Sequence, residues 1–221
     1  MNRFQNLTSW LITISLPYVL IMLSIRLLFN PLFLMFEYNF PNFPPDNYGF
    51  STQERLKWGS LSIEYMFNEG DPDFLANLAF ENGQPIYNER EVSHMLDVKI
   101  LVQATLRIFY GLVILYLAII LWAILRKWTQ QLWAGLSRGG WLTLILIGAV
   151  LAGVAISFDA LFTAFHKVFF TGDTWLFYYS DTLIRLFPIR LWQDAFILMG
   201  VFTVGMSLFF AIYGKKQSLK T

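Results

Sequence analysis

The sequence of 221 residues contains no cysteine. Disulfides, thiolate metal ligands, cysteine nucleophiles and S-acylation are therefore excluded. Charged residues are also scarce, at 14% of the chain, whereas hydrophobic residues make up 56% and the mean hydropathy is +0.51. The 22 Phe and eight Trp fit a lipid-facing surface. This composition excludes a water-soluble domain and indicates an integral membrane protein.

Four apolar stretches are long enough to cross a bilayer. They cover residues 7–36, 100–125, 141–165 and 192–213. The first carries Arg26, is too long for a signal peptide and lacks a small-residue cleavage site, so we interpret it as a retained span. The predicted fold class is an all-α membrane protein, a single integral domain with four transmembrane helices.

Basic residues give the expected orientation. The loop between the second and third stretches holds Arg126, Lys127 and Arg138 without an acid, and the tail 214–221 is also purely basic. The short segment before the first stretch carries Arg3. The positive-inside rule places these segments, and hence both termini, in the cytoplasm.

Residues 37–99 then form a long outer loop, which is expected to fold as a mostly helical cap. Ser51 and Glu54 have the spacing of a capping box and predict a helix over 52–67. The Asp-Pro and Asn-Gly pairs that bound residues 71–83 predict a second, short helix between them.

The chain has only two histidines, and both are expected on the outer side. His94 precedes the second span on a helix predicted to run unbroken from Asn88 to Leu125. His166 directly follows the third span and opens the second outer loop, residues 166–191. One span begins and another ends at the same surface, so the two imidazoles can meet there. This convergence favours an enzyme over a scaffold.

Carboxylates lie close to His94 in the sequence. Glu91 and Asp97 are each three residues away, so the three side chains share one side of the helix. A carboxylate beside an imidazole can fix its tautomer and raise its basicity, as a general base requires. A solvated helix face explains each acid about as well.

The second outer loop contains an acid and a base four residues apart. Ser180-Asp181 can cap a short helix that must end before Pro188. Asp181 and Arg185 can form a surface pair. Alternatively, Asp181 positions Arg185 to stabilise an oxyanion or bind a lipid head group. We interpret the many aromatic residues of this loop as an interfacial belt.

Three ionisable residues are expected at membrane depth: Arg26, Arg107 and Asp159. Charges there are costly and usually mark function. The arginines can snorkel to the interface, but the short side chain of Asp159 cannot, which makes it the better site candidate. We expect Asp159 to pair with an arginine beneath the histidines.

Two motifs together resemble the integral membrane family that contains the bacterial lipoprotein intramolecular transacylase (Lit). They are Glu91-x-x-His94-x-x-Asp97-Val98-Lys99 and Phe165-His166-x-x-Phe169-Phe170…Trp175…Asp181-x-Leu183-Ile184-x-Leu186-Phe187-Pro188. The resemblance covers essentially the whole chain. It implies a multi-pass protein of the bacterial cell membrane whose active site faces outward.

The resemblance also implies a reaction. The sn-2 acyl chain of a diacylglyceryl-cysteine moves to the α-amino group of the same cysteine and leaves a lyso-form lipoprotein. The implied partners are a diacylglyceryl lipoprotein and membrane lipid, with no nucleic acid, cofactor or metal. The implied catalytic residues are His94 and His166, either of which could take the proton of the amine or return it to the glycerol oxygen, by direct attack or through an acyl-enzyme. The candidate supporting residues are Asp97, Asp181, Arg185, Glu91 and Asp159.

Two alternatives remain open. The two imidazoles and a nearby carboxylate could form the zinc shell of a membrane hydrolase, although the spacing matches no standard zinc motif. The chain could also be a transporter or an accessory subunit. Inverted repeats and helices broken by Gly or Pro would favour transport, and the sequence shows neither.

Overall fold

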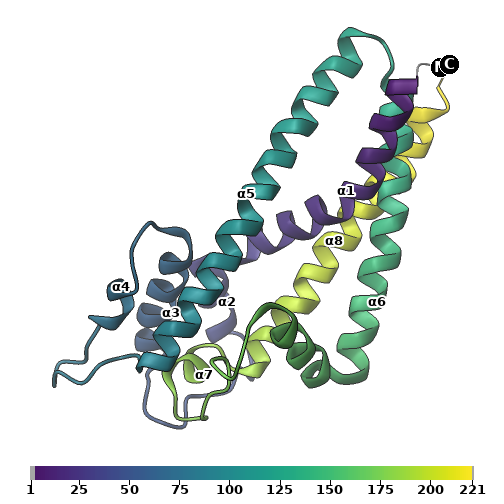
Figure 1. Cartoon of the computed structure of the whole chain (residues 1–221). Helices are drawn as coiled ribbons and strands as arrows, with labels where there is room; N and C mark the ends of the chain where they lie inside the picture. Colours follow the sequence, from purple (N-terminus) through teal and green to yellow (C-terminus); the bar gives the residue numbers. More distant parts are fainter. Residues whose placement is uncertain (1–2, 221) are drawn as a thin grey trace. The chain divides into compact units, whose positions relative to one another are not determined.

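The computed structural model describes residues 3–220, and within that range the regular secondary structure is all helical apart from one isolated bridge. This confirms the predicted all-α class. The helices, labelled in Figure 1, are α1 (Arg3–Leu28), α2 (Pro31–Tyr38), α3 (Thr52–Phe67), α4 (Asp73–Ala76), α5 (Glu89–Leu125), α6 (Thr129–Phe169), α7 (Thr182–Leu186) and α8 (Ile189–Ser218).

Four of these helices, α1, α5, α6 and α8, are long and apolar enough to cross a membrane. The first predicted stretch, 7–36, is divided between two helices. α1 ends at Leu28, and Asn30 then caps α2 by accepting hydrogen bonds from two backbone N–H groups. Pro31 occupies the first position of α2, where its missing N–H costs nothing.

The third predicted stretch, 141–165, is also interrupted. Ser157 lies inside α6 with φ −161° and ψ 99°, so the helix is broken there. Its Oγ accepts a hydrogen bond from the N–H of Ala160 at 3.3 Å, as an N-cap residue does. The helix therefore restarts at Phe158. A serine hydroxyl, rather than Gly or Pro, accounts for this break.

The chain divides into two compact units. Unit 1 comprises the described residues up to Leu27, Leu106–Ile156 and the residues from Phe196 onward. Unit 2 comprises Leu28–Thr105 and Ser157–Ala195. Unit 1 thus holds most of the apolar helical segments, and unit 2 holds the predicted cap together with both histidines.

Within unit 1, glycines allow helices to approach closely. A Cβ added to Gly135 would lie 2.6 Å from the carbonyl oxygen of Ser9, and one on Gly139 would lie 2.8 Å from Leu16. These glycines of α6 have the Gly-xxx-Gly spacing typical of close helix packing in membranes. The Ser9 hydroxyl strengthens the α1–α6 contact by donating to the carbonyl oxygen of Gln131 at 2.7 Å.

Replacing Gly135 by alanine is expected to destabilise the protein by about 1–3 kcal/mol, because the new methyl group collides with backbone. Gly148 of the same helix is the matched control, since an added Cβ there meets nothing within 4 Å. Gly148→Ala should be neutral or slightly stabilising. Thermal unfolding in detergent measures both. Equal unfolding temperatures for the two variants would contradict the close α1–α6 contact.

Unit 2 contains the cap. Ser51 and Glu54 form the predicted capping box, and the helix they start spans Thr52–Phe67 as expected. The second cap helix is shorter than predicted: α4 ends at Ala76, and the chain then turns at Gly83, whose φ is +81°. A left-handed turn at glycine competes with helix here.

The cap has a buried apolar core that joins distant segments. Tyr65, Leu75 and Leu186 are almost completely buried within it. The Tyr38 hydroxyl donates to the carbonyl oxygen of Leu186 at 2.7 Å, which fixes α7 against the end of α2. α7 ends before Pro188, as predicted.

Candidate active site

The first turn of α5 positions His94. The Asn88 side chain accepts a hydrogen bond from the Glu91 N–H at 3.0 Å, and the Glu91 carboxylate accepts one from the Asn88 N–H at 2.8 Å. These reciprocal bonds form a second capping box, which the sequence analysis did not identify. They start a helix that continues without a break to Leu125 and gives His94 a rigid base.

The helical segment that restarts after Ser157 positions His166 near its C-terminal end. The two imidazole rings are nearly parallel, with centroids 6.0 Å apart and an interplanar angle of 23°. Both residues are buried, His94 to 7% exposure and His166 to 9%. The structure thus brings the two histidines together, although they lie 72 positions apart (94 to 166) in the sequence.

Aromatic rings surround the imidazole pair. Phe170 and Phe177 lie edge-on to the His94 ring at centroid distances of 5.0 and 5.3 Å. Phe162 and Trp175 lie 4.1 and 5.0 Å from the His166 ring. Three of these four aromatics come from the loop interpreted as an interfacial belt. They line the site instead, so water has little access to the imidazoles.

One hydrogen bond fixes the tautomer of His166. Its Nδ1 lies 2.8 Å from the carbonyl oxygen of Phe162. A carbonyl oxygen can only accept, so Nδ1 carries the proton, and the neutral ring has its lone pair on Nε2. His94 differs: its Nδ1 is buried and has no hydrogen-bond partner among the described residues.

The candidate carboxylates Glu91, Asp97 and Asp159 lie in three different environments. Glu91 is 1% exposed, and its second oxygen accepts from the Leu183 N–H at 2.6 Å, so it ties α7 to α5. Asp97 is half-buried, with no hydrogen bond among the described residues. Asp159 is exposed in the first turn after Ser157, where the helix end favours a negative charge. Its pairing with an arginine beneath the histidines stays a prediction.

The predicted interaction between Asp181 and Arg185 is wrong. Asp181 pairs with Arg90 at 2.8 Å. Arg185 pairs with Asp46 through two hydrogen bonds of 3.1 and 3.0 Å, and its guanidinium group lies 3.6 Å from the centroid of the Phe50 ring. A partner distant in sequence therefore replaces the neighbour four residues away.

Arg90 is the residue that the sequence analysis missed. It lies four residues before His94, so the two side chains share one face of α5. Its guanidinium group lies 5.6 Å from the centroid of Phe177, the ring that lies edge-on to His94. This spacing from His94 was the only signal in the sequence, since Asp181 is 91 residues away.

No set of donors for a metal ion forms in residues 3–220. A zinc site would need a carboxylate beside the two imidazoles, and no group of three or more His, Asp or Glu side chains in this range is arranged to hold an ion. The donor geometry therefore gives the hydrolase alternative no support.

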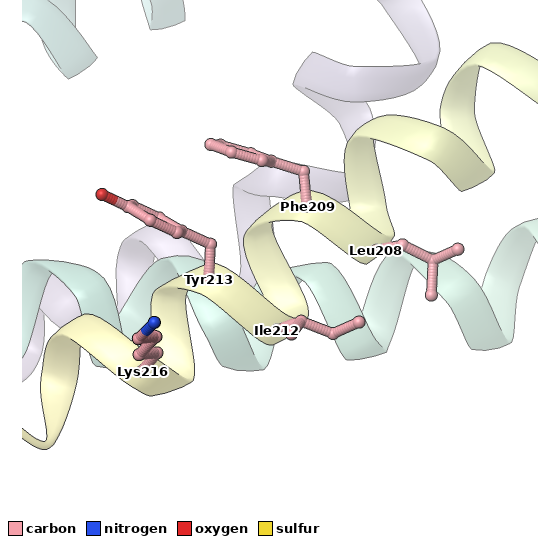
Figure 2. A pocket seen from close by; sticks show the side chains of 5 residues that line it. All are labelled: Leu208, Phe209, Ile212, Tyr213 and Lys216. Carbon is pink, nitrogen blue, oxygen red and sulfur yellow. The ribbon is translucent and has the colours of Figure 1, made fainter.

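Unit 1 has an apolar groove on α8. Figure 2 shows its five lining side chains, which all come from α8 and are all exposed. They are Leu208, Phe209, Ile212, Tyr213 and Lys216. This apolar stripe, with a lysine at its end, is typical of a lipid-facing helix surface.

Comparison with known proteins identifies the family. Residues 10–192 match the model of the lipoprotein intramolecular transacylase Lit. The chain belongs to the Lit family. It is therefore an acyltransferase integral to the membrane.

A relative from Aquifex aeolicus (strain VF5), described as uncharacterized, is 32% identical over 96% of each chain. The solved structure of the lipoprotein intramolecular transacylase Lit from Bacillus cereus covers 98% of this chain and 97% of its own, with 21% identity and a TM-score of 0.80. A variant of that protein covers 97% and 92%, with 20% identity and a TM-score of 0.73. At this identity, the structures establish the shared fold.

Proposed function

We propose that this chain moves the sn-2 acyl chain of an S-diacylglyceryl-cysteine to the α-amino group of the same cysteine. The product is an N-acyl, S-monoacylglyceryl lipoprotein, the lyso form. Membership of the Lit family supports this reaction. The observation that carries the proposal is the buried histidine pair, in which the tautomer of His166 leaves Nε2 free to accept a proton.

His166 is the proposed general base. The neutral substrate amine attacks the sn-2 carbonyl carbon, and as the N–C bond forms, Nε2 of His166 takes one proton from the nitrogen. The product of this step is a tetrahedral oxyanion beside an imidazolium. When this intermediate collapses, the bond to the glycerol oxygen breaks, and the imidazolium returns the proton to that oxygen. Atoms and charges balance without a coenzyme, since one ester is exchanged for one amide.

His94 is the proposed donor to the oxyanion. Its ring lies beside that of His166, and its Nδ1 has no hydrogen-bond partner among the described residues. A preorganised donor in a water-poor site stabilises developing charge strongly. The aromatic walls hold amine and ester together, and such intramolecular positioning replaces several kcal/mol of entropic cost.

We further propose that both termini are cytoplasmic and that the histidines face the extracytoplasmic side of a bacterial cell membrane. The basic loop 126–138 and the basic tail support this orientation. Because the chain lacks cysteine, single Ser51→Cys and Ser218→Cys variants can be labelled cleanly. A membrane-impermeant maleimide should label only the first in intact cells, and labelling of only the second would reverse the orientation.

Mass spectrometry of a reporter lipoprotein tests the function. The reporter is expressed with this chain in a bacterium that lacks its own N-acylation. The expected N-terminal peptide keeps the same total acyl mass but carries one acyl group on nitrogen. A peptide that retains a free amine and both glycerol esters would contradict the proposal.

A further inference from the structure

The guanidinium group of Arg90 has a buried hydrogen-bond donor without a partner among the described residues. One terminal nitrogen of its guanidinium group donates to Asp181 at 2.8 Å, while its Nε is buried without a partner among the described residues. A buried donor on a charged group is costly to leave unpaired. The side chain is otherwise well fixed, since it also lies over the rings of Phe177 and Tyr178.

The position of Arg90 indicates what its Nε–H binds. Arg90 lies one turn before His94, about 6 Å along α5 and away from the apolar stretch 100–125. The acyl chains of a lipid substrate would leave the histidines in the direction in which the sequence of α5 becomes apolar. The opposite end of the site, beside Arg90, is where the polypeptide of a lipoprotein would leave.

The charge of the Arg90–Asp181 pair indicates which class of ligand binds there. Asp181 neutralises the guanidinium group, and it also accepts hydrogen bonds from Asn88 and from the Tyr178 N–H. Because Asp181 neutralises the charge of the guanidinium group, its buried Nε–H matches a neutral carbonyl oxygen better than a phosphate or carboxylate.

We infer that Arg90 is a specificity-determining residue, whose Nε–H binds the carbonyl oxygen of the acylated cysteine and thereby selects lipopeptide over simple lipid esters. This inference rests on the proposed acyl transfer. The hydrogen bond forms in the ground state and is kept in the transition state, so its loss should raise KM more than it lowers kcat.

Two substrates test the inference: a diacylglyceryl lipopeptide, and S-diacylglyceryl cysteamine, which keeps the amine and esters but lacks the carbonyl group. With the lipopeptide, Arg90→Gln should raise KM about tenfold, the size of one hydrogen bond to a charged group. With the cysteamine analogue, the wild type and Arg90→Gln should have the same kcat/KM. The ratio of wild type to variant therefore falls from about 10 to about 1.

Controls separate binding from folding. Arg90→Lys keeps the charge beside Asp181 without an Nε–H, so it should reproduce the KM effect at the wild-type unfolding temperature. If Arg90→Gln does not fold, the KM of Arg90→Lys shows whether the Nε–H contributes to substrate binding. Arg190→Gln removes another arginine–aspartate pair of unit 2, at 2.5 Å from Asp194, and should leave KM unchanged.

The possible failures are distinguishable. A wild type that transfers no acyl group on either substrate overturns the proposed function itself. An active wild type with an unchanged KM in Arg90→Lys overturns the inference alone. Loss of kcat on both substrates without a change in KM would also overturn it, because Arg90 would then stabilise the oxyanion.

Discussion

Replacing His166 by alanine should lower kcat by about 100- to 10,000-fold, the contribution typical of a general base. The hydrogen bond from Nδ1 to the Phe162 carbonyl oxygen fixes the lone pair of His166 on Nε2. Activity is lost because no other described side chain near the site has a lone pair fixed in this way. His166→Asn should be equally inactive, although its amide N–H can replace the bond to Phe162. The neighbouring Lys167 is exposed, and Lys167→Ala should retain full activity.

His94→Ala should also be strongly impaired, by about 100- to 1,000-fold, the range for removal of an oxyanion donor. His94→Gln keeps an N–H donor and should recover part of this loss. The pH dependence of kcat/KM separates the two roles, since its acidic limb reports protonation of the base. That limb should persist in His94→Gln. If it persisted instead in His166→Asn, the two assignments would be reversed.

Replacing Arg185 by methionine should destabilise the protein by about 3–5 kcal/mol, the cost of leaving one partner of a buried ion pair alone. The side chain of Asp46 is 2% exposed and that of Arg185 is 12% exposed. The double variant Asp46→Asn, Arg185→Met leaves no buried charge unpaired and should recover most of the stability. It should also transfer acyl groups, since neither residue contacts the histidines.

The Asp46–Arg185 pair makes the stability of the folded protein depend on pH. Burial alone would raise the pKa of Asp46, but hydrogen bonds from Arg185 and from the backbone of Phe50 and Tyr48 outweigh it and lower the pKa. The folded state therefore binds the Asp46 proton less tightly than the unfolded chain does. The stabilisation is complete above the usual aspartate pKa of about 4 and is lost as pH falls through the lower, folded-state value.

Thermal unfolding of the single and double variants as a function of pH measures both the loss of stability and its dependence on pH. The unfolding temperature of the wild type should fall more steeply in acid than that of the double variant. A stable but inactive Arg185→Met protein would contradict the structural role and restore Arg185 as an oxyanion donor.

Local patterns in the sequence predicted most of the fold. Four apolar stretches, the capping box at Ser51 and Glu54, and the end of α7 before Pro188 each depend on residues within a few positions of one another. The break at Ser157 was missed because a serine in an apolar run usually bonds back within the helix. Here its hydroxyl caps the following turn instead.

The histidine pair could be anticipated from topology, whereas its surroundings could not. Arg90 finds Asp181 and Arg185 finds Asp46 only after the cap folds, so spacing along the chain favoured the wrong partner. The aromatic loop was ambiguous for a similar reason. Composition alone does not distinguish rings that face lipid from rings such as Phe170 and Trp175 that pack on the imidazoles.

The central claim, transfer within one substrate molecule, is tested most directly by a crossover measurement. One lipopeptide carries a deuterated sn-2 acyl chain on an unlabelled peptide, and the other carries an unlabelled chain on a ¹³C-labelled peptide. The two are mixed with the wild-type protein, and the products are analysed by mass spectrometry. We expect every N-acylated ¹³C-labelled peptide to carry an unlabelled acyl group. Deuterated acyl groups on the ¹³C-labelled peptide would show transfer between molecules and contradict the account.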